Sequence, residues 1–287
     1  QIHIVSSRPS VKNFPCYKTI GEAFEKEDFG YVVISNETNN HYHSFIELDK
    51  LGYAGKLLIE KPVFEKVYPL PLKDYSNVFV GYNLRFHPII QEMYKLLNNR
   101  EIFSLQMYAG SYLPHWRPHT DYQKCYSASR EKGGGVLRDL SHELDLLSWM
   151  TGAWKYITAV GGKYSPLEID SDDMFVVFLE MEHCPVVCLQ VNYLDHKSRR
   201  EIIANLQDIS VKADLINNTI EINGKQKKFK VGENLTYELQ HRAVLEGNRN
   251  SICTLEQGLE VLEMIHTAEI AAEKKLWIMS SSSEVTS

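Results

Sequence analysis

The stretch Tyr31–Pro62, YVVISNETNNHYHSFIELDKLGYAGKLLIEKP, decides the fold class. It opens with the apolar run Tyr31–Ser35, continues through an amphipathic segment at His43–Leu51, and closes with a second apolar run at Lys56–Ile59. A strand, a helix and another strand in this order predict a crossover between parallel strands. Because Tyr31–Ser35 is continuously apolar rather than alternating, we expect it to be buried on both faces of its sheet.

The same alternation of predicted strands and helices continues on both sides of this stretch. Apolar runs at Ile2–Val5 and Val78–Tyr82 predict two further strands, and the spacing of apolar residues in Thr19–Glu27 predicts a helix. Repeated strand–helix units indicate a doubly wound, Rossmann-like α/β sheet. We therefore interpret residues 1–82 as a nucleotide-binding type of domain.

The pattern changes after Tyr82, where strands begin to follow one another. Most of the segment from Tyr156 to Val231 reads as strands, and Asn223-Gly224 is typical of a tight hairpin turn. These features predict an α+β domain with a large, mostly antiparallel open sheet over residues 83–279, followed by a tail at 280–287. The helices predicted in it are His87–Leu97, Asp139–Met150 and Glu256–Lys274.

Composition narrows the class of protein. The 287 residues are 44% hydrophobic, and their 37 acidic against 31 basic side chains argue against a nucleic-acid-binding surface. No apolar run approaches the roughly 20 residues that a membrane span needs. The five cysteines are odd in number and scattered, which predicts reduced thiols and a cytoplasmic location rather than a disulfide framework.

Three motifs, in this order and at this spacing, resemble the glucose-fructose oxidoreductase/inositol dehydrogenase/MocA-type (Gfo/Idh/MocA) oxidoreductases. The first is Thr38–His43, which follows a predicted strand and has Asn39 where the family often has proline. The second is Glu60-Lys61-Pro62 at the end of another strand. The third is the run Gly133–Asp145, GGGVLRDLSHELD, in which an aspartate and a histidine are separated by two residues.

The resemblance implies an NAD(P)-dependent dehydrogenase or reductase that transfers a hydride between nicotinamide and a sugar or sugar-derived alcohol or ketone. The short Asp139-to-His142 spacing, with Tyr112-Leu113-Pro114 and Asp121-Tyr122 upstream, is similar to a subgroup associated with bacterial surface-sugar biosynthesis. On this basis Lys61, His142 and Asp139 are the expected catalytic residues.

The residues themselves support these roles but allow others. Pro62 favours extended backbone at Lys61, which places a positive charge at a strand end, although an ordinary surface lysine would look the same. In one continuous helix Asp139, His142 and Asp145 would share a stripe, and a carboxylate beside the imidazole would raise its basicity. A helix N-cap at Asp139 and a core histidine at His142 are the structural alternatives.

The expected cofactor contacts lie at the predicted strand ends. Hydroxyls and a guanidinium there would suit a 2′-phosphate, so NADP is weakly preferred over NAD. The expected cofactor-binding residues are Ser6, Ser7, Arg8, Asn36, Thr38, His41, Glu60 and Lys61. The family's first strand and its Gly-x-Gly-x-x-Gly turn do not precede Ile2–Val5. We expect either a sequence that lacks this unit or a degenerate family member, and the other motifs favour the former.

An aromatic loop between Gly110 and Gly135 is the expected substrate site, because flat rings and hydrogen-bonding groups suit sugar faces. Pro118 separates His115 from His119 and disfavours a helical metal-binding pair, so no metal is expected. The expected substrate-binding residues are Arg85, Tyr112, Trp116, Arg117, Asp121 and Tyr122.

The expected partners are a sugar-type small molecule and a second copy of the chain, with no nucleic acid and no membrane. The strand-rich region would pair in a homodimer or homotetramer. Two other functions stay open. The protein could be a non-catalytic sugar or nucleotide-sugar binding member of the same fold, or it could use NAD in a lyase or glycosidase reaction without net redox change.

Overall fold

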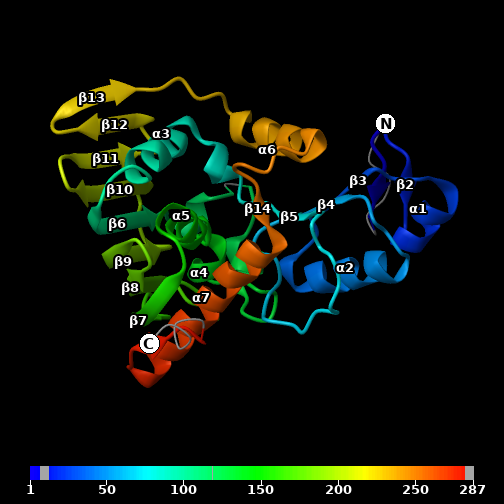
Figure 1. The fold of residues 1–287 in the computed structure, drawn as a ribbon. Coiled ribbons are helices and arrows are strands. Elements are labelled where there is room, and N and C mark those ends of the chain that lie inside the picture. Colours follow the sequence, from blue (N-terminus) through cyan, green and yellow to red (C-terminus); the bar gives the residue numbers. More distant parts are fainter. Residues whose placement is uncertain (7–12, 118, 282–287) are drawn as a thin grey trace.

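The computed structural model describes residues 1–6, 13–117 and 119–281. Figure 1 shows a small sheet near the N-terminus and a larger sheet on the opposite side of the molecule, with helices between them. The small sheet is built around parallel strands and the large one is mostly antiparallel, which confirms the predicted fold class.

The first sheet contains three parallel strands and one antiparallel edge strand. Its order is β14-β5-β4-β3. The strands are β3 (Tyr31–Ile34), β4 (Lys56–Ile59), β5 (Val78–Val80) and β14 (Cys253–Thr254). The crossover from β3 to β4 runs through the short 3-10 turn η1 (Thr38–Asn40) and α2 (His41–Lys50), as the opening stretch predicts.

Residues at the N-terminus form a separate parallel pair. This pair consists of β1 (Ile4–Val5) and β2 (Cys16–Tyr17), and α1 (Ile20–Lys26) follows it. The hydroxyl of Thr19 accepts a hydrogen bond from the Glu22 amide and caps α1.

The expectation that Tyr31–Ser35 is buried on both faces is wrong for part of the strand. Val33 of β3 is 39% exposed, whereas Ile34 is buried. The helix α6 (Leu235–Glu246) packs over the neighbouring strands and contacts Tyr31 through His241, but it does not extend over Val33. The continuous apolar run therefore predicted a strand correctly, but it overestimated how much of the strand other elements bury.

The large sheet has nine strands, of which only β6 and β9 are parallel neighbours. In spatial order the strands are β13 (Lys225–Lys228), β12 (Thr219–Ile222), β11 (Ser210–Asp214), β10 (Arg199–Leu206), β6 (Ile102–Gly110), β9 (Cys184–Asn192), β8 (Met174–Met181), β7 (Trp154–Gly162) and β15 (Ile278–Met279). The predicted turn joins β12 to β13, with positive φ angles at both Asn223 and Gly224.

Helices cover one face of this sheet. Figure 1 shows them between the two sheets, and no helix of the described chain lies over the opposite face of the large sheet. These helices are α3 (Pro88–Leu97), α4 (Val136–Asp139), α5 (His142–Thr151) and α7 (Leu255–Lys274). One short 3-10 turn, η2 (Asn83–Phe86), lies between β5 and α3, and three others lie between β6 and α4, namely η3 (Leu113–His115), η4 (Tyr122–Lys124) and η5 (Tyr126–Ala128).

The sequence did not predict α6, because its buried positions carry little apolar signal. They are Thr236, Gln240, Ala243 and Val244. Nor did it predict β14, which pairs with β5 across the proposed boundary at residue 82 and links the C-terminal part of the chain to the first sheet. Within the described residues no helix is both long enough and apolar enough to cross a membrane.

A buried ion pair joins the segment after β5 to α5. The Arg85 guanidinium donates to both oxygens of Asp145, with N–O distances of 2.7 to 3.2 Å, and it also donates to Gln257 of α7 at 2.9 Å. Arg85 is 1% exposed and Asp145 is fully buried. Charges this deep cost desolvation energy, so each depends on its partner.

Replacing one member of this pair should be much more destabilising than breaking an exposed pair. We expect Asp145→Asn to lower the free energy of unfolding by about 3–5 kcal/mol, because it leaves the Arg85 charge buried without a counterion. The control is Asp208→Asn, which removes the exposed partner of Arg100 and should cost less than about 1 kcal/mol. Urea denaturation measures both. Equal losses in the two variants would contradict this role for Arg85 and Asp145.

Candidate active site

Lys61 follows the carboxyl end of β4 and points toward the second half of the molecule. Its Nζ donates a hydrogen bond of 2.5 Å to the main-chain carbonyl of Asp139, and the side chain is only partly exposed. Burial lowers the pKa of Lys61, while the Asp139 carboxylate acts in the opposite direction. The strand-end lysine is therefore a partly buried group that contacts the second half of the molecule, rather than an ordinary surface lysine.

A break in the helix makes this contact possible. The sequence predicts one helix over Asp139–Met150, but the structure has α4 ending at Asp139 and α5 beginning at His142. The Glu143 amide bonds to the Leu140 carbonyl rather than to that of Asp139. The Asp139 carbonyl is thereby left for Lys61. The alternative that Asp139 is the helix N-cap is wrong, because Ser141 holds that position.

His142 is the first residue of α5 and shares this region with Lys61. Its ring packs edge-on against Tyr82, which follows β5, with ring centroids 5.6 Å apart. Burial, with the nearby charges of Lys61 and Arg200, holds the pKa of His142 well below its usual value. The expectation that a neighbouring carboxylate raises its basicity is wrong, because Asp145 is paired with Arg85 and His142 Nδ1 has no hydrogen-bond partner among the described residues.

Asp139 is held from the opposite side by the large sheet. The hydroxyl of Tyr193, which follows β9, donates to Asp139 Oδ2 at 2.6 Å. The other oxygen, Oδ1, is buried without a partner among the residues described. The carboxylate thus keeps one acceptor available close to Lys61.

Three consecutive glycines bring the chain into this position. A Cβ on Gly133 would press against Thr38, one on Gly134 would collide with the main-chain carbonyl of Tyr126, and one on Gly135 would collide with the Asp172 side chain. Gly133 and Gly135 also have positive φ angles of 79° and 119°. The glycine run therefore allows the close approach of the Thr38 turn, the η5 turn and α4.

The expected cofactor residues lie mainly where the parallel strands end. Asn36 follows β3 and bonds to the Ser44 hydroxyl at 2.9 Å, while Thr38 is buried beside Gly133. Glu60 follows β4, and burial raises the pKa of its carboxyl group. Ser6 follows β1, and its amide bonds to the Tyr17 carbonyl. Ser7 and Arg8 lie outside the described residues.

His41 does not fit its expected role as a cofactor ligand. Its Nδ1 lies 3.1 Å from the Pro62 carbonyl and 3.2 Å from that of Val63, and its Nε2 lies 3.1 Å from the Asn36 carbonyl. The ring is 1% exposed. His41 hydrogen-bonds the turn after β3 to the segment that follows Lys61, so its role is to hold these two turns together.

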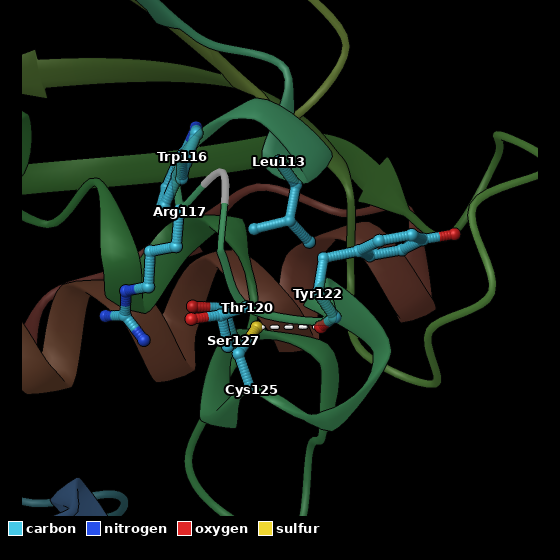
Figure 2. A pocket seen from close by; sticks show the side chains of 7 residues that line it. All are labelled: Leu113, Trp116, Arg117, Thr120, Tyr122, Cys125 and Ser127. Carbon is cyan, nitrogen blue, oxygen red and sulfur yellow. Dashed lines mark hydrogen bonds between the residues drawn. The ribbon is translucent and has the colours of Figure 1, made fainter.

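The aromatic loop forms a small pocket, shown in Figure 2. Trp116, Arg117 and Tyr122, three of the expected substrate residues, line it together with Leu113, Thr120, Cys125 and Ser127. Trp116 packs edge-on against Tyr193 with centroids 5.2 Å apart, which connects the pocket wall to Asp139. Tyr112 lies outside this pocket and packs against His196 at 4.1 Å.

Two expected substrate residues are engaged elsewhere. Arg85 is enclosed with Asp145 and cannot line a cleft, so its assignment is corrected to a structural one. Asp121 accepts from the Gln123 amide at 3.1 Å and pairs with Lys124 at 3.2 Å, so its carboxylate caps its own turn. From the sequence, Arg85 and Asp121 could not be distinguished from Arg117, because all three are charged. Arg117 has no ion-pair partner among the described residues and lies over the Tyr126 ring.

Sequence reasoning missed Tyr193, Tyr126 and Arg200. Tyr193 directly follows an alternating strand, which was an available signal for a side chain at the sheet end. Arg200 pairs with Glu143 of α5 at 2.7 Å, and its charge reaches both Lys61 and His142. Nothing in the local sequence indicated that pairing, because the partners are 57 residues apart.

The lowered pKa of His142 makes stability depend on pH. Between pH 7 and 5 the unfolded chain takes up a proton on this imidazole, near its usual pKa of about 6.5, and the folded protein does not. Stability therefore falls as the pH falls. The free energy of unfolding should therefore fall less for His142→Asn than for the unmodified protein between pH 7 and 5, by up to about 2 kcal/mol. Urea unfolding at both pH values measures the two changes. Equal losses would show that the folded protein protonates His142.

The chain is similar to known oxidoreductases. Residues 90–230 match the family model described as the GFO/IDH/MocA C-terminal domain. An uncharacterized oxidoreductase of Synechocystis is 29% identical over 152 residues. The aligned region is 50% of this chain and 40% of that relative, so it spans less than half of the relative's length.

Solved structures share the fold over most of the chain. GenD2 from gentamicin A biosynthesis, in complex with NAD, has a TM-score of 0.74 and 20% identity, covering 93% of this chain and 83% of its own. The WlbA dehydrogenase from Bordetella pertussis, in complex with NADH and UDP-GlcNAcA, has a TM-score of 0.72 and 16% identity, covering 93% and 84%. At these identities the likeness establishes the fold. Residues 90–230 therefore match the C-terminal domain of the GFO/IDH/MocA oxidoreductase family, and the chain as described shares the fold of these dehydrogenase structures.

Proposed function

We propose that the protein is an NAD(P)-dependent oxidoreductase that interconverts an alcohol and a ketone on a sugar. The observation that carries this proposal is the convergence of Lys61 and His142 from the two halves of the molecule, with the Lys61 Nζ bonded to the carbonyl three residues before His142. One polarising cation and one neutral imidazole, both partly buried and close together, are the groups that such a reaction needs.

The described residues fit the nicotinamide end of a dinucleotide. Asn36 and Glu60 lie at the carboxyl ends of β3 and β4, which is where open α/β sheets bind such ligands. A buried acceptor, Asp139 Oδ1, remains unsatisfied close to Lys61. When bound there, the nicotinamide ring would take or give the hydride.

His142 would transfer the proton, and Lys61 would stabilise the negative charge on the reacting oxygen. During alcohol oxidation His142 would accept the hydroxyl proton while the substrate carbon gives up its hydrogen as a hydride and the carbon–oxygen double bond forms; a bound nicotinamide would supply the hydride acceptor. Protonated Lys61 donates a hydrogen bond to the reacting oxygen and stabilises its negative charge. In the reductive direction the same two groups return the proton. The low pKa of His142 keeps the imidazole neutral and able to accept.

The side chains of the aromatic loop, rather than the small pocket between them, suit a nucleotide-linked sugar as the substrate class. Trp116 and Tyr122 offer flat apolar surfaces, and Arg117 offers a cation that has no ion-pair partner among the described residues. The WlbA dehydrogenase, which shares the fold, was solved with a nucleotide-linked sugar acid. We extend the proposal to sugars of the kind used in bacterial surface polysaccharides, and to a reducing, cytoplasmic setting, which suits the odd number and scattered positions of the five cysteines.

Removing either converging group should abolish turnover while leaving cofactor binding in place. We expect Lys61→Met and His142→Asn each to lower kcat by about 10²–10⁴-fold, because a positioned acid or base contributes that much. NADH absorbance with nucleotide-sugars and keto-sugars measures turnover, and NADH fluorescence measures binding. Lys66→Met, an exposed lysine in the next turn, is the control. Full activity in both site variants, or a protein that binds no dinucleotide, would refute the proposed function.

We further propose that the uncovered face of the large sheet binds a second copy of the chain. Val160, Phe178 and Val186, on three adjacent strands, are 66%, 45% and 60% exposed. Their side chains alternate with buried ones, so they lie on the face opposite the helices. Exposed apolar side chains on adjacent strands suit a self-complementary interface.

Sedimentation or light scattering on the purified chain should show a dimer or tetramer. We expect Phe178→Lys combined with Val186→Lys to give a monomer with unchanged secondary structure, because the two ammonium groups would be desolvated in the interface. The control is Lys227→Glu on the β13 edge, which should leave the assembly intact. A monomeric parent protein at micromolar concentration would contradict this interface.

A further inference from the structure

The buried side chain of Tyr193 has a hydroxyl that the proposed reaction does not use. Its ring is fully enclosed, and both of its main-chain groups are fixed, the amide by the Asp173 carbonyl at 2.9 Å and the carbonyl by the Leu113 amide at 3.0 Å. Trp116 packs edge-on against the ring, at an interplanar angle of 89°. The hydroxyl therefore has a fixed direction, and it points at Asp139.

We propose that Tyr193 is a positioning residue that holds the Asp139 carboxylate in place and so keeps Lys61 protonated at the pH of catalysis. The inference rests on the proposed function, because Lys61 is taken to polarise the reacting oxygen. It adds a residue outside the three motifs and connects the substrate loop, through Leu113 and Trp116, to the lysine.

Two tyrosine hydroxyls approach the Asp139 carboxylate. Oδ2 accepts from Tyr193 at 2.6 Å, and Oδ1 has no hydrogen-bond partner within the described chain. Tyr126 approaches the same carboxylate, and burial together with the Asp139 charge raises the pKa of its hydroxyl. Without the Tyr193 hydroxyl, the contact with Tyr126 would remain to orient the Asp139 side chain.

Rotation of Asp139 would be felt at Lys61. Burial disfavours the lysine charge, and the Asp139 carboxylate is the strongest group that favours it. The other charged or titratable groups that face Lys61 are Glu60 on its own turn, Glu143 and His142 on α5, and Arg200 on β10. Glu143 is already paired with Arg200, so it cannot replace Asp139.

The test follows the titration of Lys61 itself, without turnover. The chain of residues 1–287 is treated with formaldehyde and a borane reductant at a series of pH values. Methylation of Lys61 is quantified by mass spectrometry, since only the neutral amine reacts. In Tyr193→Phe the midpoint for Lys61 should move to lower pH by about one unit. Tyr53→Phe, which removes a hydroxyl bonded to the Lys56 carbonyl far from the cleft, should not move it.

Activity gives the second readout. With an active substrate, the alkaline limb of the kcat profile should move down by the same amount in Tyr193→Phe, with KM nearly unchanged. An unmoved Lys61 midpoint in a folded Tyr193→Phe protein overturns the proposal. If that variant does not fold, Tyr126→Phe takes its place and should give a smaller shift in the same direction; no shift there also overturns it. A shifted midpoint in a chain without oxidoreductase activity would support the positioning role and refute the proposed function.

Discussion

The hydrogen bond from the Lys61 ammonium group to the main-chain carbonyl of Asp139 is the contact on which the site depends. It joins a turn at the end of one sheet to a helix break that lies against the other sheet. A carbonyl inside a regular helix is already used by the amide four residues ahead. The chain therefore has to interrupt the helix at Leu140 and Ser141, and it does so directly before His142. Lysine and histidine are brought together by the same irregularity.

Low solvent access then sets the protonation state of each group. Burial disfavours charge on both Lys61 and His142, the charge of Arg200 acts against protonation of both, and the charge of Lys61 acts against protonation of His142. The Asp139 carboxylate opposes this effect at the lysine, whereas His142 Nδ1 has no hydrogen-bond partner among the described residues. The carboxylate therefore favours charge on the lysine only, and the imidazole stays neutral. The buried pair of Arg85 and Asp145 lies behind this arrangement and removes one carboxylate from the reach of His142.

Much of the fold could be predicted from sequence. Apolar runs and helical spacing gave β4 and α3 with nearly correct bounds, and the Asn-Gly pair gave the β12–β13 turn. Local signals failed where tertiary contacts decide the outcome. The polar buried side chains of α6 have no apolar periodicity, and β14 is only two residues long.

The site was predictable in its centre and not at its edges. The strand-end lysine and the histidine after the glycine run are brought together as expected. His41 and Arg85 were misassigned because their residue types suit ligands, and only their contacts reveal that carbonyls or a buried partner already occupy them. Tyr193 lies 54 residues from Asp139, so no spacing rule could have joined them.

The central claim is that Lys61 and His142 act on one substrate as a unit. A double-mutant cycle on kcat tests this most directly, with Lys61→Met, His142→Asn and the combined variant. Groups that act together are strongly non-additive. If the two groups act as a unit, kcat of the combined variant should be about equal to kcat of the slower single variant. Losses that multiply, so that the combined effect equals the product of the two single effects, would contradict it.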